Sequence, residues 1–139
     1  MELLSINTLI KTRDENVAKI LIVDDEETIL NYLSTLLRQA KHEVFTASNG
    51  ELGLELVKKI DPNLVITDYK MPYMNGVQLY LEATIINDNI PFIFLTGYGN
   101  EVTALDEAYE VVAKPPNEAK LLELVDEKVL TPEATEFQV

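Results

Sequence analysis

Residues 63–76 read NLVITDYKMPYMNG, and the first half of this stretch decides the fold. Asn63–Thr67 is almost wholly apolar, which is typical of a strand that is covered on both faces of its sheet. A carboxylate, Asp68, follows the apolar run directly. Strands covered on both faces occur in parallel sheets with helices on either side, so this stretch predicts an α/β protein.

The same pattern, a short apolar run next to a segment with helical spacing, recurs on both sides of this stretch. Strands are expected at Lys19–Val23, Glu43–Ala47, Asn63–Thr67, Ile90–Leu95 and Glu110–Ala113. Helices are expected at Glu26–Ala40, Gly50–Ile60, Val77–Ile86, Glu101–Glu107 and Asn117–Val129. The pair Asp61-Pro62 ends the second helix because proline cannot continue it, and Asn117 is a suitable N-cap for the last one. Five such units predict an all-parallel sheet with helices on both faces.

The composition is that of one acidic globular domain. The chain has 139 residues, a formal net charge of −13 and no cysteine, which excludes disulfides and thiolate metal sites. Nucleic-acid binding by counterion release needs a basic surface, so nucleic acid is not an expected partner. The sequence has no apolar run near the ~20 residues of a membrane span and no secretory signal pattern. A cytoplasmic protein without membrane contact is therefore expected.

The two ends of the chain lie outside the repeating pattern. Residues 1–18 form an N-terminal extension that is either a further amphipathic helix or a disordered segment, and residues 131–139 are expected to form a loose tail. The folded domain is expected to cover residues 19–130. Because the tail is too short for an output domain, we expect a stand-alone regulator or a relay intermediate.

Polar side chains stand at the ends of four expected strands: Asp24 and Asp25, Asp68, Thr96 and Lys114. The carboxyl ends of parallel strands share one edge of the sheet, where such sheets bind ligands. Adjacent carboxylates repel each other unless a cation neutralises them, and their oxygens suit Mg²⁺. Taken alone, Asp24 and Asp25 also fit an acidic start of the following helix, stabilised by its dipole. Together, the residues predict a site for a divalent cation and a phosphoryl group.

Asp68 is the candidate nucleophile of this site. A carboxylate at a strand end can attack phosphorus and form an aspartyl phosphate. The reaction needs charge to offset the repulsion between two anions and donors for the transferring oxygens. The Lys114 ammonium would supply charge, and the Thr96 hydroxyl would supply a hydrogen bond.

These residues carry a family resemblance. The chain resembles the receiver domain of two-component response regulators, and the resemblance covers Lys19 to about Val129. Four segments carry it: Asp24-Asp25, the run DYKMPYMNG at 68–76, Thr96-Gly97 and Lys114-Pro115. The resemblance implies a flavodoxin-like, doubly wound sheet with strand order 2-1-3-4-5. It also implies a cis bond between Lys114 and Pro115.

The resemblance further implies a role for each site residue. Asp68 matches the phosphoacceptor. Asp24, Asp25, Asp68 and the backbone carbonyl of Lys70 match the Mg²⁺ ligands. Thr96 matches the hydroxyl that moves toward the phosphoryl group, and Lys114 matches the lysine of the family.

The implied function is phosphorylation-controlled signalling. The donor would be a histidine kinase or a histidine phosphotransfer protein, and the target an unknown protein. The chain would be a monomer or a phosphorylation-dependent dimer, and a phosphoacceptor rather than a turnover enzyme. Two alternatives remain open: a receiver-fold scaffold that does not use phosphate, and an aspartate-nucleophile phosphatase. The phosphatase needs an Asp-x-Asp after the first strand, and Asp24-Asp25-Glu26 breaks that spacing.

Two positions depart from the family pattern. The segment from Thr96 to Lys114 is shorter than usual by about one helical turn. Val111 stands three residues before Lys114, where the family often has an aromatic. In the family, both changes fall on the surface used for output and dimerisation. We therefore expect this chain to signal through a different face or to a different partner. His42, the only histidine, is expected to be a solvated loop residue.

Overall fold

The computed structural model describes the backbone of residues 17–97 and 109–136 and the side chains of residues 17–97 and 110–129. The elements are β1 (Lys19–Val23), α2 (Glu27–Gln39), β2 (Glu43–Ala47), α3 (Gly50–Ile60), β3 (Leu64–Asp68), α4 (Gly76–Ile86), β4 (Phe92–Thr96), β5 (Tyr109–Ala113) and α5 (Glu118–Glu136). The five strands form one parallel sheet in the order β2-β1-β3-β4-β5. This confirms the predicted fold class and strand order.

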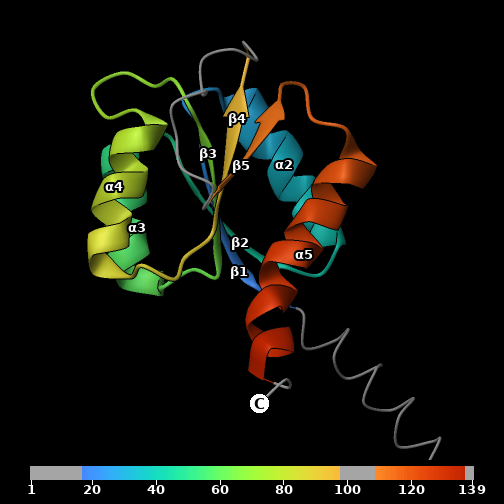
Figure 1. Cartoon of the computed structure of the whole chain (residues 1–139). Coiled ribbons are helices and arrows are strands. Elements are labelled where there is room, and N and C mark those ends of the chain that lie inside the picture. The colour runs from blue at the N-terminus through green and yellow to red at the C-terminus, as the bar shows by residue number, and fades with distance from the viewer. Residues whose placement is uncertain (1–16, 98–108, 137–139) are drawn as a thin grey trace, which may run out of the picture.

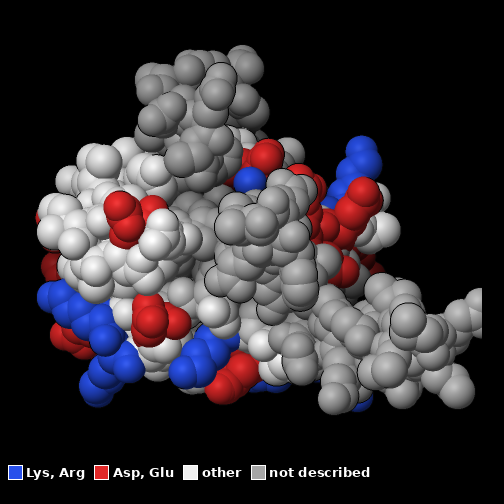
Figure 2. Space-filling model, turned by 60° about the horizontal axis from the view of Figure 1, so that its bottom comes forward, with Lys and Arg blue, Asp and Glu red and all other residues white. Residues whose placement is uncertain are grey.

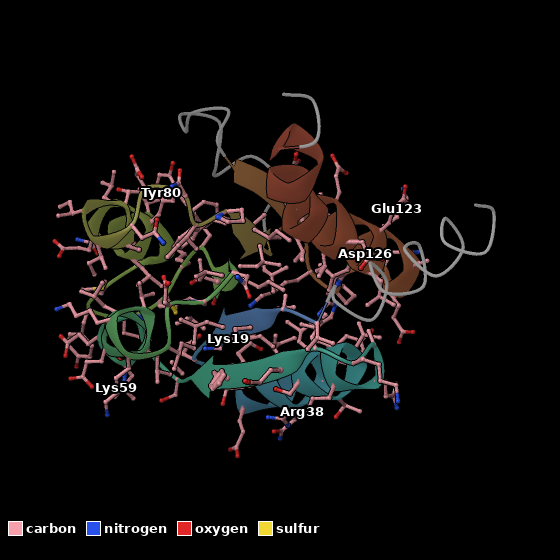
Figure 3. All side chains as sticks on the ribbon, turned by 90° about the horizontal axis from the view of Figure 1, so that it is seen from below. Lys19, Arg38, Lys59, Tyr80, Glu123 and Asp126 are labelled. Carbon is pink, nitrogen blue, oxygen red and sulfur yellow. The ribbon has the colours of Figure 1, made fainter. Side chains whose placement is uncertain are left out.

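Two layers of helices cover the sheet. Helices α2 and α5 lie against one face, and α3 and α4 against the other (Figure 1). Successive side chains of a strand point to opposite faces, so Ile20 and Ile22 of β1 enter the first core while Leu21 and Val23 enter the second. Seen from below, Lys19 at the start of β1 lies between the two layers (Figure 3). Every residue of β3 and β4 is buried, as the apolar runs predict.

Asparagine side chains begin the helices that follow β2, β3 and β5. Asn49 accepts a hydrogen bond from the backbone of Leu52 at the start of α3. Asn75 forms a capping box with Gln78 at the start of α4, at 2.8 and 2.9 Å. Asn117 accepts from the backbone of Lys120, which confirms it as the cap of α5. These bonds satisfy N–H groups that a helix leaves unpaired in its first turn.

Several boundaries differ from those expected. Strands β3 and β4 each reach one residue further, so that Asp68 and Thr96 are their last residues. Helix α5 continues to Glu136, so residues 131–136 are helical and not a tail.

His42 is a buried residue, so the expectation of a solvated loop position is wrong. Its Nδ1 accepts a hydrogen bond of 3.2 Å from the backbone N–H of Ala18, which is itself buried. The carbonyl of Ala18 accepts a hydrogen bond from the backbone N–H of Glu43. Both bonds of Ala18 therefore connect the start of β1 to the start of β2. Burial lowers the pKa of His42, and the charge of Asp126 opposes this only in part.

Two expectations fall outside the described residues: a helix at Glu101–Glu107, and the nature of residues 1–16. Among the helices in the described part of the chain, none has both the length and the apolar character needed to cross a membrane.

The His42 contact predicts a pH dependence of stability. The unfolded chain has an imidazole with its ordinary pKa of 6.5, and the folded chain has a lower one. The unfolded state therefore binds more protons between the two values, and stability falls as the pH falls through about 6.5. We expect His42→Asn, whose amide oxygen can accept the Ala18 bond, to lose less stability than the wild type between about pH 7 and pH 5. Urea unfolding at both pH values measures this. Equal losses in the two proteins would contradict it.

Candidate phosphoryl and metal site

The sheet register brings the predicted residues to one edge. Val23 of β1 pairs with Thr67 of β3, and Thr96 of β4 pairs with Ala113 of β5. The ladder continues past the strand ends, because the N–H of Lys114 donates to the Thr96 carbonyl at 2.8 Å. The four residues of the site consequently lie at one level along the carboxyl edge of the sheet. Asp68 and Thr96 are the last residues of β3 and β4, and Asp24 and Lys114 directly follow β1 and β5.

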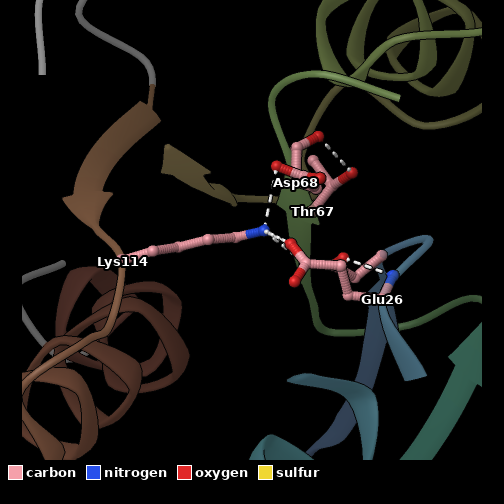
Figure 4. Close-up of polar contacts among 5 residues, drawn as sticks. Glu26, Thr67, Asp68 and Lys114 are labelled. Carbon is pink, nitrogen blue, oxygen red and sulfur yellow. Dashed lines mark hydrogen bonds and ion pairs between the residues drawn. The ribbon is translucent and has the colours of Figure 1, made fainter. Parts of the chain in front are cut away.

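Lys114 is the centre of the site. Its Nζ lies 2.9 Å from Asp24 Oδ2, 3.3 Å from Asp68 Oδ1 and 3.1 Å from Glu26 Oε1 (Figure 4). Burial alone would lower the pKa of Lys114, but its carboxylate partners, Asp24 first, outweigh this and raise it. Lys114 is therefore a fixed positive charge at neutral pH.

Asp24 is fully buried, and its two oxygens are held differently. Oδ1 accepts a 2.8 Å hydrogen bond from the backbone N–H of Glu26. Oδ2 faces the Lys114 ammonium at 2.9 Å but receives no well-directed hydrogen bond from any described group. Burial raises the pKa of Asp24, against the Glu26 and Lys114 contacts that lower it.

Asp68 is buried beside the same lysine. Burial raises the pKa of Asp68 to about 6, the charge of Asp24 adds to this, and Lys114 opposes it. The side chain faces a hollow of about 360 Å³, which is also lined by Thr96, Lys70 and Lys114. Thr96, which is 2% exposed, lines this hollow.

The acidic residues fit a divalent cation. Asp24, Asp25 and Asp68 each offer a carboxylate oxygen, and these oxygens lie within 4.8 Å of one another. Carboxylate oxygens are the ligands that Mg²⁺ prefers. The buried Asp24 Oδ2 has the Lys114 ammonium as its described partner, so the three carboxylates share a single lysine and leave negative charge for a cation to neutralise. The part assigned to the Lys70 carbonyl stays a prediction.

The loop after Asp68 has two special backbone positions. A Cβ at Gly76 would lie 2.4 Å from the Asp68 carbonyl oxygen, so only glycine allows this approach. Tyr73 has a left-handed backbone, with φ of 67°, and a side chain that is 96% exposed. Tyr73 and Asp25 line a second hollow of about 320 Å³ beside the first.

The structure brings the predicted strand-end residues together, but the sequence pattern did not predict a further residue that contacts them. Glu26 contacts Lys114, whereas its sequence position suggested only the start of a helix. The third acid in Asp24-Asp25-Glu26 was the available signal. The expected cis bond between Lys114 and Pro115 is present. Val111 lies at the surface of β5 with 39% exposure, and most of the shortened segment before it lies outside the described residues.

Comparisons with known proteins agree with this fold and site. The sequence pattern of the response regulator receiver domain matches residues 20–126. Sporulation initiation phosphotransferase F of Bacillus subtilis is 37% identical over 95 residues, which cover 68% of this chain and 76% of that protein. Regulatory protein AtoC of Escherichia coli is 34% identical over 103 residues, which cover 71% of this chain but only 22% of that longer protein.

Solved structures give the same result. A response regulator receiver domain protein from Clostridium thermocellum has a TM-score of 0.78 and 33% identity, covering 85% of this chain and 98% of that one. A CheY-like receiver domain protein from Methanospirillum hungatei has a TM-score of 0.76 and 31% identity, covering 86% and 98%. The chain belongs to the response regulator receiver domains of two-component signalling.

The raised pKa of Asp68 predicts a second pH dependence, opposite in sign to that of His42. The unfolded carboxyl has its ordinary pKa of 3.8, and the folded one has a pKa of about 6. The folded state therefore binds more protons between these values, and stability falls as the pH rises through them. Without divalent cations, we expect Asp68→Asn to raise the free energy of unfolding at about pH 7.5 by about 1–3 kcal/mol.

Urea unfolding in the presence of a chelator measures this difference. Asp88→Asn is the matched control, because Asp88 is an exposed carboxylate of the link between α4 and β4. The interpretation is wrong if Asp68→Asn stabilises the protein no more than Asp88→Asn does.

Proposed function

We propose that the chain is a phosphorylation-controlled switch in which Asp68 accepts the phosphoryl group. The observation that carries the proposal is the position of Lys114, which contacts Asp24 and Asp68 at 2.9 and 3.3 Å beside an open hollow. A buried carboxylate next to a fixed ammonium can act as a nucleophile toward an anionic phosphoryl group, because the ammonium offsets their repulsion.

Each residue of the site has a defined part in the proposed transfer. A carboxylate oxygen of Asp68 attacks phosphorus, and the bond from phosphorus to the donor's imidazole nitrogen or acyl oxygen breaks. The donor keeps the electron pair of that bond, and a donor imidazole takes up a proton from water. The Lys114 ammonium stabilises the negative charge on the phosphoryl oxygens, and the Thr96 hydroxyl donates a hydrogen bond to one of them.

The same proposal includes a magnesium ion. Asp24, Asp25, Asp68 and the Lys70 carbonyl would hold it, and it would neutralise the charge that gathers when the two anions meet. The carboxylate cluster supports the proposal, because Lys114 offsets only part of its negative charge.

The proposed partners follow from the family and from the charge of the chain. The phosphoryl donor would be a histidine kinase or a histidine phosphotransfer protein, and the target a downstream protein. The chain itself would be a phosphoacceptor and not a turnover enzyme. The name of the Bacillus subtilis relative describes a phosphotransferase, which supports a relay role. A net charge of −13 disfavours a nucleic-acid partner. The proposed location is the cytoplasm, and the proposed states are a monomer and a phosphorylation-dependent dimer.

A small acyl phosphate tests the proposal directly. We expect the protein, incubated with acetyl phosphate and Mg²⁺, to gain the mass of one phosphoryl group, and to gain none when a chelator replaces Mg²⁺. Asp68→Asn should abolish the gain, because the nucleophilic oxygen is replaced by an amide nitrogen. Intact mass spectrometry at successive times measures the adduct.

Asp88→Asn is again the control and should keep the adduct. A scaffold that does not use phosphate would show no adduct with Mg²⁺ present. A phosphatase would instead release phosphate steadily from several monoesters. Either result, or an undiminished adduct in Asp68→Asn, contradicts the proposal.

A further inference from the structure

Glu26 contacts Lys114 from the open side of the site. Its Oε1 lies 3.1 Å from the Lys114 Nζ, beside the contacts that the same ammonium makes with Asp24 and Asp68 (Figure 4). The three acidic side chains differ in burial: that of Asp24 is 0% exposed, that of Asp68 8% and that of Glu26 57%. Of the three partners, Glu26 is therefore the one that can leave Lys114 without stranding a buried charge.

Lys114 is the sole polar partner of the Glu26 side chain among the described residues. Glu26 is the residue before α2, and its backbone carbonyl accepts hydrogen bonds from Ile29 and Leu30 at the start of that helix. Its side chain makes no capping hydrogen bond to α2. The backbone of Glu26 is thus fixed, while its carboxylate is free to move between Lys114 and solvent.

The contact faces the space that a phosphoryl group would occupy. Glu26, Asp68, Thr96 and Lys114 line the same hollow of about 360 Å³. A phosphoryl group on Asp68 would extend into this hollow, and its oxygens would need a donor from Lys114. An ammonium has three N–H donors, and Lys114 has three carboxylate partners. Because Asp24 stays buried, the donor that serves Glu26 is the one that can pass to a phosphoryl oxygen.

Other bases of the described fold lie mainly on the far side of the sheet. Helices α2 and α3 lead into the starts of β2 and β3, and their last turns carry Arg38 and Lys59. Figure 2 shows that side, where basic side chains lie beside acidic ones, and Figure 3 labels Arg38 and Lys59 on it. Among the described residues, Lys70 and Lys114 are the bases that line the hollow. Competition for Lys114 therefore affects how strongly the site attracts an anion.

We propose that Glu26 competes with the phosphoryl group for the Lys114 ammonium and leaves it when Asp68 is phosphorylated. In the unphosphorylated chain, Glu26 neutralises the open side of Lys114. After the transfer, a phosphoryl oxygen takes its place and the Glu26 carboxylate turns to water. Glu26 is thus a positioning residue that acts through Lys114 and slows phosphorylation. This inference rests on the proposed function, because it concerns the same transfer to Asp68.

Glu26→Gln and Glu26→Asp test the competition. The first variant removes the charge. The second keeps the charge but shortens the side chain, and aspartate is a preferred cap that turns its carboxylate toward α2. We expect both variants to accept a phosphoryl group from acetyl phosphate about three to five times faster than the wild type, the rate ratio that corresponds to an exposed ion pair. Intact mass spectrometry at successive times, with saturating Mg²⁺, measures the initial rates.

Glu27→Gln is the matched control. Glu27 is the neighbouring exposed carboxylate, and it forms no ion pair with a described residue. This variant removes the same charge without touching Lys114, so any effect on the rate should disappear at high salt. The effect of Glu26→Gln should persist there, because salt screens a contact with a partly buried lysine much less.

The outcomes separate this inference from the proposed function. A Glu26→Gln rate no greater than that of Glu27→Gln at high salt, or a Glu26→Asp rate equal to that of the wild type, overturns the competition. Slower phosphorylation in both Glu26 variants also overturns it, because Glu26 would then hold Lys114 in place for the transfer. In each of these cases, an adduct that the wild type forms and Asp68→Asn lacks leaves the proposed function intact. The absence of an adduct in the wild type and in every variant contradicts both.

Discussion

The ion pairs of Lys114 are the interactions on which the site depends. They join the residue after β5, at one edge of the sheet, to carboxylates after β1 and at the end of β3. Without this ammonium, Asp24 and Asp68 would be two buried like charges, an arrangement that costs several kcal/mol per uncompensated ion. The lysine compensates only part of the charge, since Asp25 and Glu26 bring further carboxylates to the same edge. The folded chain therefore holds excess negative charge where a cation and a phosphoryl group would bind.

The rest of the fold keeps these charges in place. The fully buried strands β3 and β4 form the centre of the sheet and fix the height of Asp68 and Thr96. The approach of Gly76 to the Asp68 carbonyl ties the loop after β3 to the first residue of α4. Tyr73 in this loop has a left-handed backbone that a side chain ordinarily avoids, at a cost of about 1 kcal/mol. Charge repulsion is thus concentrated at the edge where the proposed chemistry takes place, and Tyr73 adds backbone strain there.

Much of this could be predicted from the sequence, because each strand is a short apolar run that ends at a polar residue. The parallel sheet and its converging carboxyl ends followed from that pattern. The strand order was implied by the family resemblance, which the residues after Asp68 carry most specifically. Glu26 was missed because its contact with Lys114 spans 88 positions in the chain, and spacing carries no information on such a distance. His42 was misplaced because a polar residue between a helix and a strand is usually solvated, whereas here the backbone N–H of Ala18 needs an acceptor. The end of α5 was misjudged because the helix continues past Pro132 to Glu136, and proline ordinarily ends a helix.

Calorimetric titration with Mg²⁺ tests the central claim, that the carboxylates around Lys114 form a site completed by one divalent cation. We expect the wild type to bind one Mg²⁺ per chain. We also expect Asp25→Asn to weaken binding by about tenfold or more, through loss of one charged ligand, and Asp88→Asn to leave it unchanged. The absence of binding to the wild type, or equal affinities in the Asp25→Asn and wild-type proteins, would contradict the account.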